Sequence, residues 1–365
     1  AMGDGATGYG GGWTANFGQR SFTYTAPTGF VALQQDNVPE TEKGMSDFVW
    51  MKNRDATDSH QLYDSSRGPL LDIHTDSTAA ETTTNNGLLK FLKGGQQIEQ
   101  NGFINTSGES YVSWNWTANG GTTSANTDGS GATLASNIQA NQTAGFSIVT
   151  YTGNATAGAK VAHGLSQAPQ WLWIQSRSLT TGGKIYHHKN TAAPETDYLA
   201  IQATDATFDS QWLNDTAPDA NCFTIGPSGY ATNNNGATYV AYCWHEVPGF
   251  SKFGSYTGNG NADGPFIYTG FKPAWVMYKQ TNTTNYWAIY DSTRSTRNVM
   301  QHRLAPNYNY VENVSTANQQ DFLSNGIKLR GTDTTTNQSG GTYVYMAFAE
   351  HPFNGDGETA FATAR

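Results

Sequence analysis

Three stretches of the chain share one alternating pattern of apolar and polar positions. They cover residues 108–116, 236–246 and 341–350, and each opens at a glycine, is rich in β-branched and aromatic residues and lacks proline. That composition predicts a β-strand. One face of the three expected strands is large and apolar in every copy, and it carries Val112, Trp114 and Trp116, then Val240, Tyr242 and Trp244, then Val344, Met346 and Phe348. A period of two with one apolar face predicts strands that lie over a core.

Two further elements recur with the same spacing in all three copies. Residues 48–54, 171–177 and 275–281 correspond to one another, and so do residues 61–64, 184–187 and 288–291. Separate elements that keep their spacing indicate a duplicated unit. Strands at short intervals with Gly, Asn and Thr turns favour sandwiches. The fold class that we predict is all-β, with tandem antiparallel β-sandwich (jelly-roll-like) units in three related copies.

The repeats divide the chain into five segments. Residues 1–46 form an N-terminal extension or the tail of an upstream sandwich, 47–118 a shorter first unit, 119–144 a Gly/Thr/Asn-rich linker, 145–248 the second unit and 249–365 the third. Linker composition of this kind predicts a flexible or merely draped segment. Only Val247 and Pro248 separate the closing strand of the second unit from Gly249 of the third. We therefore expect those two units to form a rigid pair and the first to sit more loosely.

Composition and charge exclude several classes of protein. Charged residues make up 13% of the chain and 40 residues are glycine, a profile that disfavours helix. The net charge of −9 argues against a nucleic-acid partner, which needs clustered Lys and Arg. The sequence has no apolar run long enough to insert into a membrane. Cys222 and Cys243 are the only cysteines; an interstrand disulfide stays open, although two buried thiols are the preferred interpretation.

The sequence shows no catalytic motif, so we predict no catalytic residue, no metal site and no cofactor. His187 and His188 are adjacent and would point to opposite faces of a strand. Glu246 and Glu350 recur at the end of the repeated strand, which favours a structural role. A glycosidase needs two carboxylates facing each other across a cleft, and the acidic candidates show no sign of convergence; they are Asp209, Asp215, Asp263 and Glu312.

Two acidic patterns are interpreted as structural. Asp64 and Asp291 follow the repeated tyrosine, and Arg67 and Arg294 lie three residues further on, which predicts an Asp–Arg contact that stabilises a turn. The Asn/Asp-rich loop 259–264 could offer oxygen ligands to Ca²⁺, but the same residues favour a tight turn, and we prefer the turn.

Aromatic residues outside the repeated core positions are the better functional candidates. Trp212, Trp287, Tyr308 and Tyr310 lie in polar, turn-rich contexts. Stacking on a sugar ring or on a partner protein would explain them, and so would ordinary capping of a sandwich edge. We predict these four as ligand-binding residues.

Several strings of the chain resemble a family of tailed-phage virion proteins, especially those of marine and cyanobacterial phages. They are residues 145–154, 161–165, 212–218 and 239–243 in the second unit, and 249–259, 263–271 and 321–326 in the third. The stretch from Asn16 to Leu33 resembles the last strands of a SPRY-like sandwich that precedes such units. The resemblance carries no catalytic motif and no binding site that can be mapped residue by residue.

The resemblance implies a non-enzymatic structural protein at the virion surface, in the tail or a fibre. Such a protein would act outside the cell, at the surface of the host. Its expected partners are other virion proteins and a host surface glycan or receptor, and the expected assembly is a homo-oligomer, a trimer. Two alternatives stay open. One is a purely architectural capsid or tail decoration protein, and the other is a tailspike that depolymerises a glycan.

Overall fold

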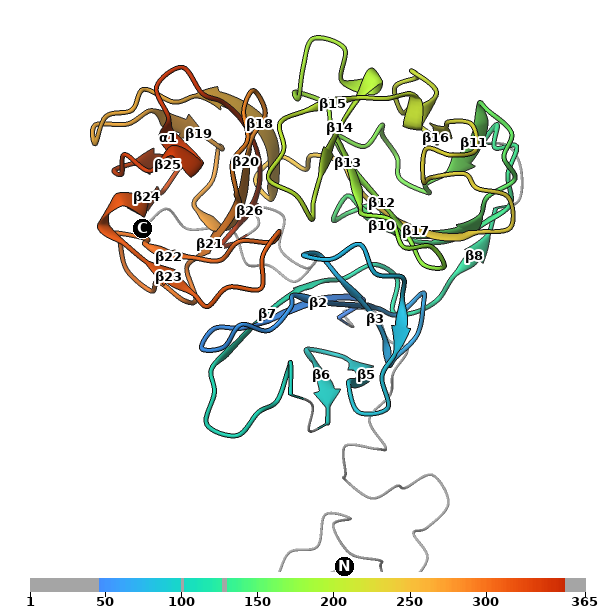
Figure 1. Cartoon of the computed structure of the whole chain (residues 1–365), viewed down its shortest axis with the longest axis horizontal. Helices are drawn as coiled ribbons and strands as arrows, with labels where there is room; N and C mark the ends of the chain where they lie inside the picture. Colours follow the sequence, from blue (N-terminus) through green and yellow to red (C-terminus); the bar gives the residue numbers. More distant parts are fainter. Residues whose placement is uncertain (1–45, 100–101, 127–129, 352–365) are drawn as a thin grey trace, which may run out of the picture.

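The computed structural model describes residues 46–99, 102–126 and 130–351. Nearly all of its regular structure is antiparallel β-strand, which confirms the predicted all-β sandwich class. The predicted N-terminal extension, residues 1–46, lies outside the described residues apart from Ser46. Figure 1 shows three groups of strands around a common centre, which we call units 1, 2 and 3 in chain order.

Unit 1 has a five-stranded sheet in the order β4-β3-β2-β1-β7 and a hairpin, β5-β6. The strands are β1 (Phe48–Asn53), β2 (Gln61–Asp64), β3 (Leu71–His74), β4 (Thr82–Thr83), β5 (Leu88–Leu92), β6 (Gly95–Ile98) and β7 (Tyr111–Trp116).

Unit 2 has an eight-stranded sheet in the order β15-β14-β13-β12-β17-β10-β9-β8 and a second layer of β11 and β16. The strands are β8 (Ser124–Ala125), β9 (Ser136–Asn141), β10 (Phe146–Thr152), β11 (Ala159–Ala162), β12 (Trp171–Ser176), β13 (Lys184–His187), β14 (Asp197–Ala200), β15 (Phe208–Asp209), β16 (Cys222–Ile225) and β17 (Thr238–Trp244). Two 3₁₀ turns lie at Pro194–Thr196 and Gln211–Leu213.

Unit 3 has a four-stranded sheet in the order β18-β26-β20-β21, a second layer β19-β25-β24 and a pair, β22-β23. The elements are β18 (Ser251–Thr257), β19 (Phe266–Tyr268), β20 (Pro273–Gln280), β21 (Trp287–Asp291), β22 (His302–Arg303), β23 (Asn313–Val314), a 3₁₀ turn at Thr316–Asn318, β24 (Gln320–Leu323), β25 (Gly326–Leu329), the short helix α1 (Thr334–Asn337) and β26 (Thr342–Ala349).

The three closing strands β7, β17 and β26 pair with β1, β12 and β20 in the same register. Phe48 lies opposite Trp116, Trp171 opposite Trp244, and Trp275 opposite Phe348. A repeated hydrogen bond marks the other end of each closing strand. The hydroxyls of Tyr111, Tyr239 and Tyr343 each accept from the backbone N–H five residues earlier, at 2.8–2.9 Å.

Each main sheet is buried on both faces. The predicted apolar face of the closing strands lies in one central core that all three units share, with Trp114 from unit 1, Tyr242 from unit 2 and Met346 from unit 3. The opposite face of each main sheet covers a separate small core inside its unit, through Val49 of β1 in unit 1, Cys243 in unit 2 and Ala347 in unit 3; along β7 itself that face is only partly buried. Burial on two faces explains why β1, β12 and β17 are buried along almost their whole length.

A repeated backbone hydrogen bond closes the three units into a ring. The N–H of Glu81 in unit 1 donates to the carbonyl of Arg177 in unit 2, at 2.8 Å. At 2.9 Å, the N–H of Glu312 in unit 3 donates to Arg54 in unit 1, and that of Thr207 in unit 2 to Thr281 in unit 3. We call each boundary between two units a seam. Every seam thus has the same backbone hydrogen bond, in the same direction around the ring.

A second repeated contact lies deeper in each seam. Asp64 of unit 1 accepts from the Tyr242 hydroxyl of unit 2 at 2.7 Å, and Asp291 of unit 3 accepts from Trp114 Nε1 of unit 1 at 3.1 Å. In the third seam the closing strand has Met346 at this position, which cannot donate. There His187 of unit 2 replaces the aspartate, and its Nε2 lies 3.1 Å from the carbonyl oxygen of Tyr345. Burial lowers the His187 pKa to about 3, so the imidazole of His187 is neutral at pH 7.

Two expectations about unit 1 are corrected by these contacts. Unit 1 does not sit loosely, because it shares the central core and is bonded to both neighbours. The segment predicted as a flexible linker also contains β9, which pairs along its whole length with β10. Its start is fixed as well, since Asp47 accepts hydrogen bonds from the backbone N–H groups of Ala118, Gly120 and Gly121.

Candidate functional site

The structure places two of the four predicted ligand-binding residues in the core. Trp212 and Trp287 are 0% exposed. Their indole N–H groups are already bonded, to the carbonyl of Asp197 at 2.9 Å and that of Ala200 at 3.0 Å. A buried indole with a satisfied donor cannot stack on an external ligand. The prediction is therefore wrong for Trp212 and Trp287.

Tyr308 and Tyr310 lie together at the surface. Their rings are stacked, with centroids 4.7 Å apart and an interplanar angle of 14°, and Tyr286 packs edge-on against Tyr308 at 5.1 Å. Tyr310 is 51% exposed. We call Tyr286, Tyr308 and Tyr310 the tyrosine surface. Sequence reasoning missed Tyr286, because it lies some twenty residues away and only the fold brings it there.

The loop that carries the tyrosine surface is fixed at the seam between units 1 and 3. Asn309 Nδ2 donates to the carbonyl of Thr57 in unit 1 at 3.1 Å. The Glu312 carboxylate bridges Arg54 of unit 1 at 2.7 Å and Arg294 of unit 3 at 2.8 Å, and also contacts His302 at 2.7 Å. Burial opposes ionisation of Glu312, but its contacts with Arg54 and Arg294 hold its pKa at about 2. The loop that carries the tyrosines is therefore held in place by hydrogen bonds and ion pairs.

The repeats show that the fold does not require these tyrosines. The seam bond aligns Glu312 with Glu81 and Thr207. Counting back from there, the positions of Tyr308 and Tyr310 hold Ser77 and Ala79 in unit 1 and Ala203 and Asp205 in unit 2. All three seams form with or without the aromatic pair, so the pair is specific to one seam.

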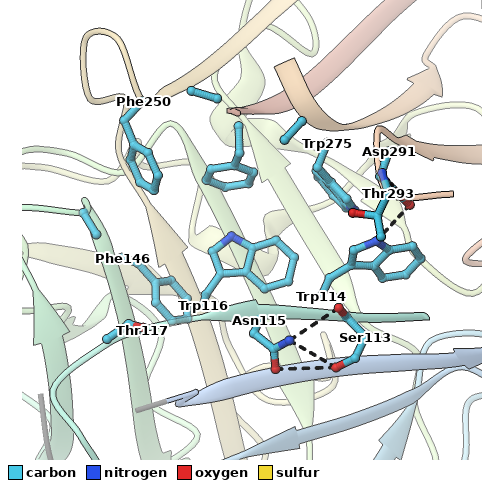
Figure 2. A pocket seen from close by; sticks show the side chains of 14 residues that line it. Ser113, Trp114, Asn115, Trp116, Thr117, Phe146, Phe250, Trp275, Asp291 and Thr293 are labelled. Carbon is cyan, nitrogen blue, oxygen red and sulfur yellow. Dashed lines mark hydrogen bonds between the residues drawn. The ribbon is translucent and has the colours of Figure 1, made fainter. Parts of the chain in front are cut away.

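A pocket of about 390 Å³ lies where the three units meet beside β7. Aromatic side chains dominate its wall, and Figure 2 shows Trp114 and Trp116 on one side of β7 with Phe146, Phe250 and Trp275 around them. Ser113 and Asn115 lie on the other side of that strand and are hydrogen-bonded to each other, with Asn115 Nδ2 3.1 Å from Ser113 Oγ. Sequence reasoning did not find this pocket, since it depends on how the units are arranged.

The predicted Asp–Arg contacts are confirmed. Asp64 pairs with Arg67, and Asp291 pairs with Arg294 at 2.5 Å between Oδ2 and Nε. Both pairs are almost completely buried. Each aspartate also accepts the seam hydrogen bond described above, so the contact holds a turn and a neighbouring unit together.

The remaining acidic and histidine candidates have structural partners. Glu246 pairs with Lys252 at 2.5 Å and Glu350 with Lys272 at 2.6 Å. In the loop 259–264, side-chain oxygens of Asn259 and Asn261 accept backbone N–H groups of the loop itself, which favours the turn interpretation. The half-buried His188 lies 2.9 Å from the carbonyl of Phe253 through its Nε2 atom.

Other features bear on the chemical class of the site. Within residues 46–99, 102–126 and 130–351, no three His, Cys, Asp or Glu side chains gather as metal ligands would. Cys222 and Cys243 are both free and buried. In the same ranges no helix is long and apolar enough to cross a membrane.

Comparison with protein families shows which family the chain belongs to. A family model described as a domain of unknown function, DUF7483, matches residues 32–352. The chain belongs to the DUF7483 family. The family match extends over all three units, so the closed ring as a whole corresponds to one DUF7483 domain. No curated protein and no solved structure matches the chain.

Proposed function

We propose that this DUF7483 protein is a non-enzymatic attachment protein at the surface of a phage virion, in a tail or fibre, and that its tyrosine surface binds a host surface glycan. The resemblance to tailed-phage proteins supports the virion part of the proposal. The observation that carries the binding part is the stacked pair of half-buried Tyr308 and exposed Tyr310, at a position where the other two seams have small or polar residues.

Stacked tyrosines suit a saccharide. The apolar face of a sugar ring packs on an aromatic ring, while the phenolic hydroxyls remain free to bond the sugar hydroxyls. The loop is already held by Asn309 and Glu312, so little conformational entropy is lost on binding. A single shallow surface of this kind binds weakly, and the proposed homotrimer in the virion would raise the avidity.

Carboxylate placement supports the non-enzymatic part of the proposal. Glu312, the acidic residue nearest the tyrosine surface in sequence, is engaged by three basic side chains. Asp263 pairs with Lys328 at 2.7 Å. A glycosidase acid needs a raised pKa, whereas the pKa values of Glu312 and Asp263 are both lowered, by their cationic partners.

The test is binding of the full chain to a glycan array and to host cells. We expect a restricted set of glycans to bind, a loss of at least tenfold in affinity for Tyr310→Ala, and no change for Tyr268→Ala. Tyr268 is a suitable control because it is 63% exposed on β19 and belongs to unit 3 as well. Absence of any glycan or cell binding by the folded chain, or equal binding by Tyr310→Ala, would overturn the proposal. Release of reducing sugar from a bound polysaccharide would indicate a depolymerase instead.

One observation favours a second candidate function, a purely architectural role. Val311 and Val314 next to the tyrosine surface are 44% and 53% exposed, and an apolar strip of this kind also fits another virion protein. In that case neither the wild-type chain nor Tyr310→Ala would bind a glycan, and Tyr310→Ala would fail to be incorporated into particles.

A further inference from the structure

The outer edge of β7 is open where the corresponding edges in the other units are covered. β17 lies between β12 and β10, and β26 lies between β20 and β18. β7 is the last strand of its sheet, and no strand within the described ranges 46–99, 102–126 and 130–351 pairs with its outer side. Unit 1 therefore lacks one strand that units 2 and 3 both have.

The backbone of β7 presents groups at that edge that no neighbouring strand bonds; the Ser113 carbonyl accepts only a long bond, 3.4 Å, from Nδ2 of Asn115 in the same strand. The carbonyls of Ser110 and Trp116 accept from Arg54 and Asp47 on the β1 side. Because backbone groups alternate along a strand, those of Tyr111, Ser113 and Asn115 point away from β1. Asn115 is exposed and Trp116 only half-buried, whereas their counterparts Cys243, Trp244, Ala347 and Phe348 are buried.

The pocket lies along the same edge. Both Ser113 and Asn115 line it, together with the two tryptophans of β7. An open strand edge beside an aromatic pocket fits an added strand better than a compact ligand, because the strand bonds the backbone while its side chains enter the pocket.

The chain has a segment with the sequence of the absent strand. β10 ends in Thr150-Tyr151-Thr152 and β18 in Ser255-Tyr256-Thr257, and residues 23–25 read Thr-Tyr-Thr. In units 2 and 3 this tyrosine stacks on the first tyrosine of the closing strand: Tyr151 on Tyr239 at 5.1 Å, and Tyr256 on Tyr343 at 4.9 Å. The equivalent residue Tyr111 is only half-buried. The segment also precedes β1 by an interval comparable to those that separate β10 from β12 and β18 from β20.

We propose that residues 19–25 of the same chain bind the outer edge of β7 as an antiparallel strand and complete unit 1. The register follows from units 2 and 3. Tyr24 lies opposite Tyr111, as Tyr151 lies opposite Tyr239, and Phe22 then lies opposite Ser113. This assigns the segment to unit 1 rather than to an upstream SPRY-like sandwich. The proposal concerns the pocket and not the tyrosine surface, so it stands independently of the proposed glycan binding.

The test is a pair of disulfide variants of the full chain. Phe22→Cys with Ser113→Cys places two thiols directly opposite, at a Cα separation of about 5.5 Å that suits a disulfide. Arg20→Cys with Ser113→Cys is the control, since it shifts one thiol by two residues on the same face, to about 7–8 Å. We expect an intramolecular disulfide, seen by mass and by mobility on a non-reducing gel, in more than half of the first variant and in under a tenth of the control.

Hydrogen exchange on the unmodified chain provides a second measurement that needs no substitution. We expect the amides of Ser113 and Asn115 to exchange at least a hundredfold more slowly than an open strand edge would. Fast exchange at both amides, or equal crosslinking in the two variants, would overturn the proposal. A disulfide that forms only between chains would also overturn it, by showing that a second copy supplies the strand.

Discussion

The Glu312 cluster at the seam between units 1 and 3 should make the stability of the whole protein depend on acid pH. The pKa of Glu312 falls from 4.5 to about 2, and one pKa unit corresponds to about 1.4 kcal/mol. The cluster therefore contributes about 3 kcal/mol, or about 2 kcal/mol once solvent at the quarter-exposed Arg54 and His302 is allowed for. Because the pKa is lowered in the folded state, this stability is complete above about pH 4.5 and is lost as the pH falls toward 2.

Glu312→Gln removes this charge with little change of shape. We expect it to lower the free energy of unfolding by about 2 kcal/mol at pH 7, and to flatten the decline in stability between pH 5 and 2.5. The loss stays moderate because Arg294 keeps its partner Asp291. The assay is urea denaturation followed by tryptophan fluorescence at a series of pH values, with wild type and variant compared at each. The central core contains tryptophans from all three units, so we expect a single transition.

Glu350→Gln is the matched control. Glu350 pairs with Lys272, and their side chains are 33% and 44% exposed, so the change should cost less than about 1 kcal/mol and leave the pH dependence unaltered. The reasoning would be refuted if Glu312→Gln cost under about 0.5 kcal/mol at pH 7, or if it kept the acid slope of the wild-type chain.

Three further predictions concern buried polar groups. Tyr242→Phe removes the hydrogen bond to Asp64 between units 1 and 2 and should cost about 1.5–3 kcal/mol in the same denaturation assay. The buried hydroxyl of Tyr290 has no hydrogen-bond partner in the described part of the chain, so Tyr290→Phe should lower the free energy of unfolding clearly less. Equal losses for the two variants would contradict the role given to the hydrogen bond between Tyr242 and Asp64. Burial lowers the pKa of Lys279 to about 7, so stability should rise between pH 7 and 10 as the unfolded chain keeps a proton that the folded chain has lost. Lys279→Met should reduce that rise and leave the part due to Lys52 and Lys184, whose pKa values burial lowers to about 8.

The repeats could be predicted from the sequence because strand periodicity reports burial directly. The alternating pattern predicts a buried face for Val112, Trp114 and their counterparts, and they are buried. Periodicity does not reveal what covers a face. The covering layer is the other two units and not a second sheet of the same unit, so the closed ring and the pocket could not be derived.

The functional candidates show what local sequence context cannot reveal. Trp212 and Trp287 lie in polar sequence contexts, yet each fills a core and donates to a backbone carbonyl from a distant strand or turn. Local polarity reports the chain neighbours and not the neighbours in space. The Asp–Arg contacts were predictable, because three residues of separation bring both ends of one turn together.

The ring of seams has a consequence for how the protein would survive damage. In a linear tandem of domains, each peptide link is the only tie between two neighbours, and one cut separates them. Here each unit is hydrogen-bonded to both others, through one backbone bond and one deeper contact at every seam. A single cleavage between two units would therefore leave all three units associated.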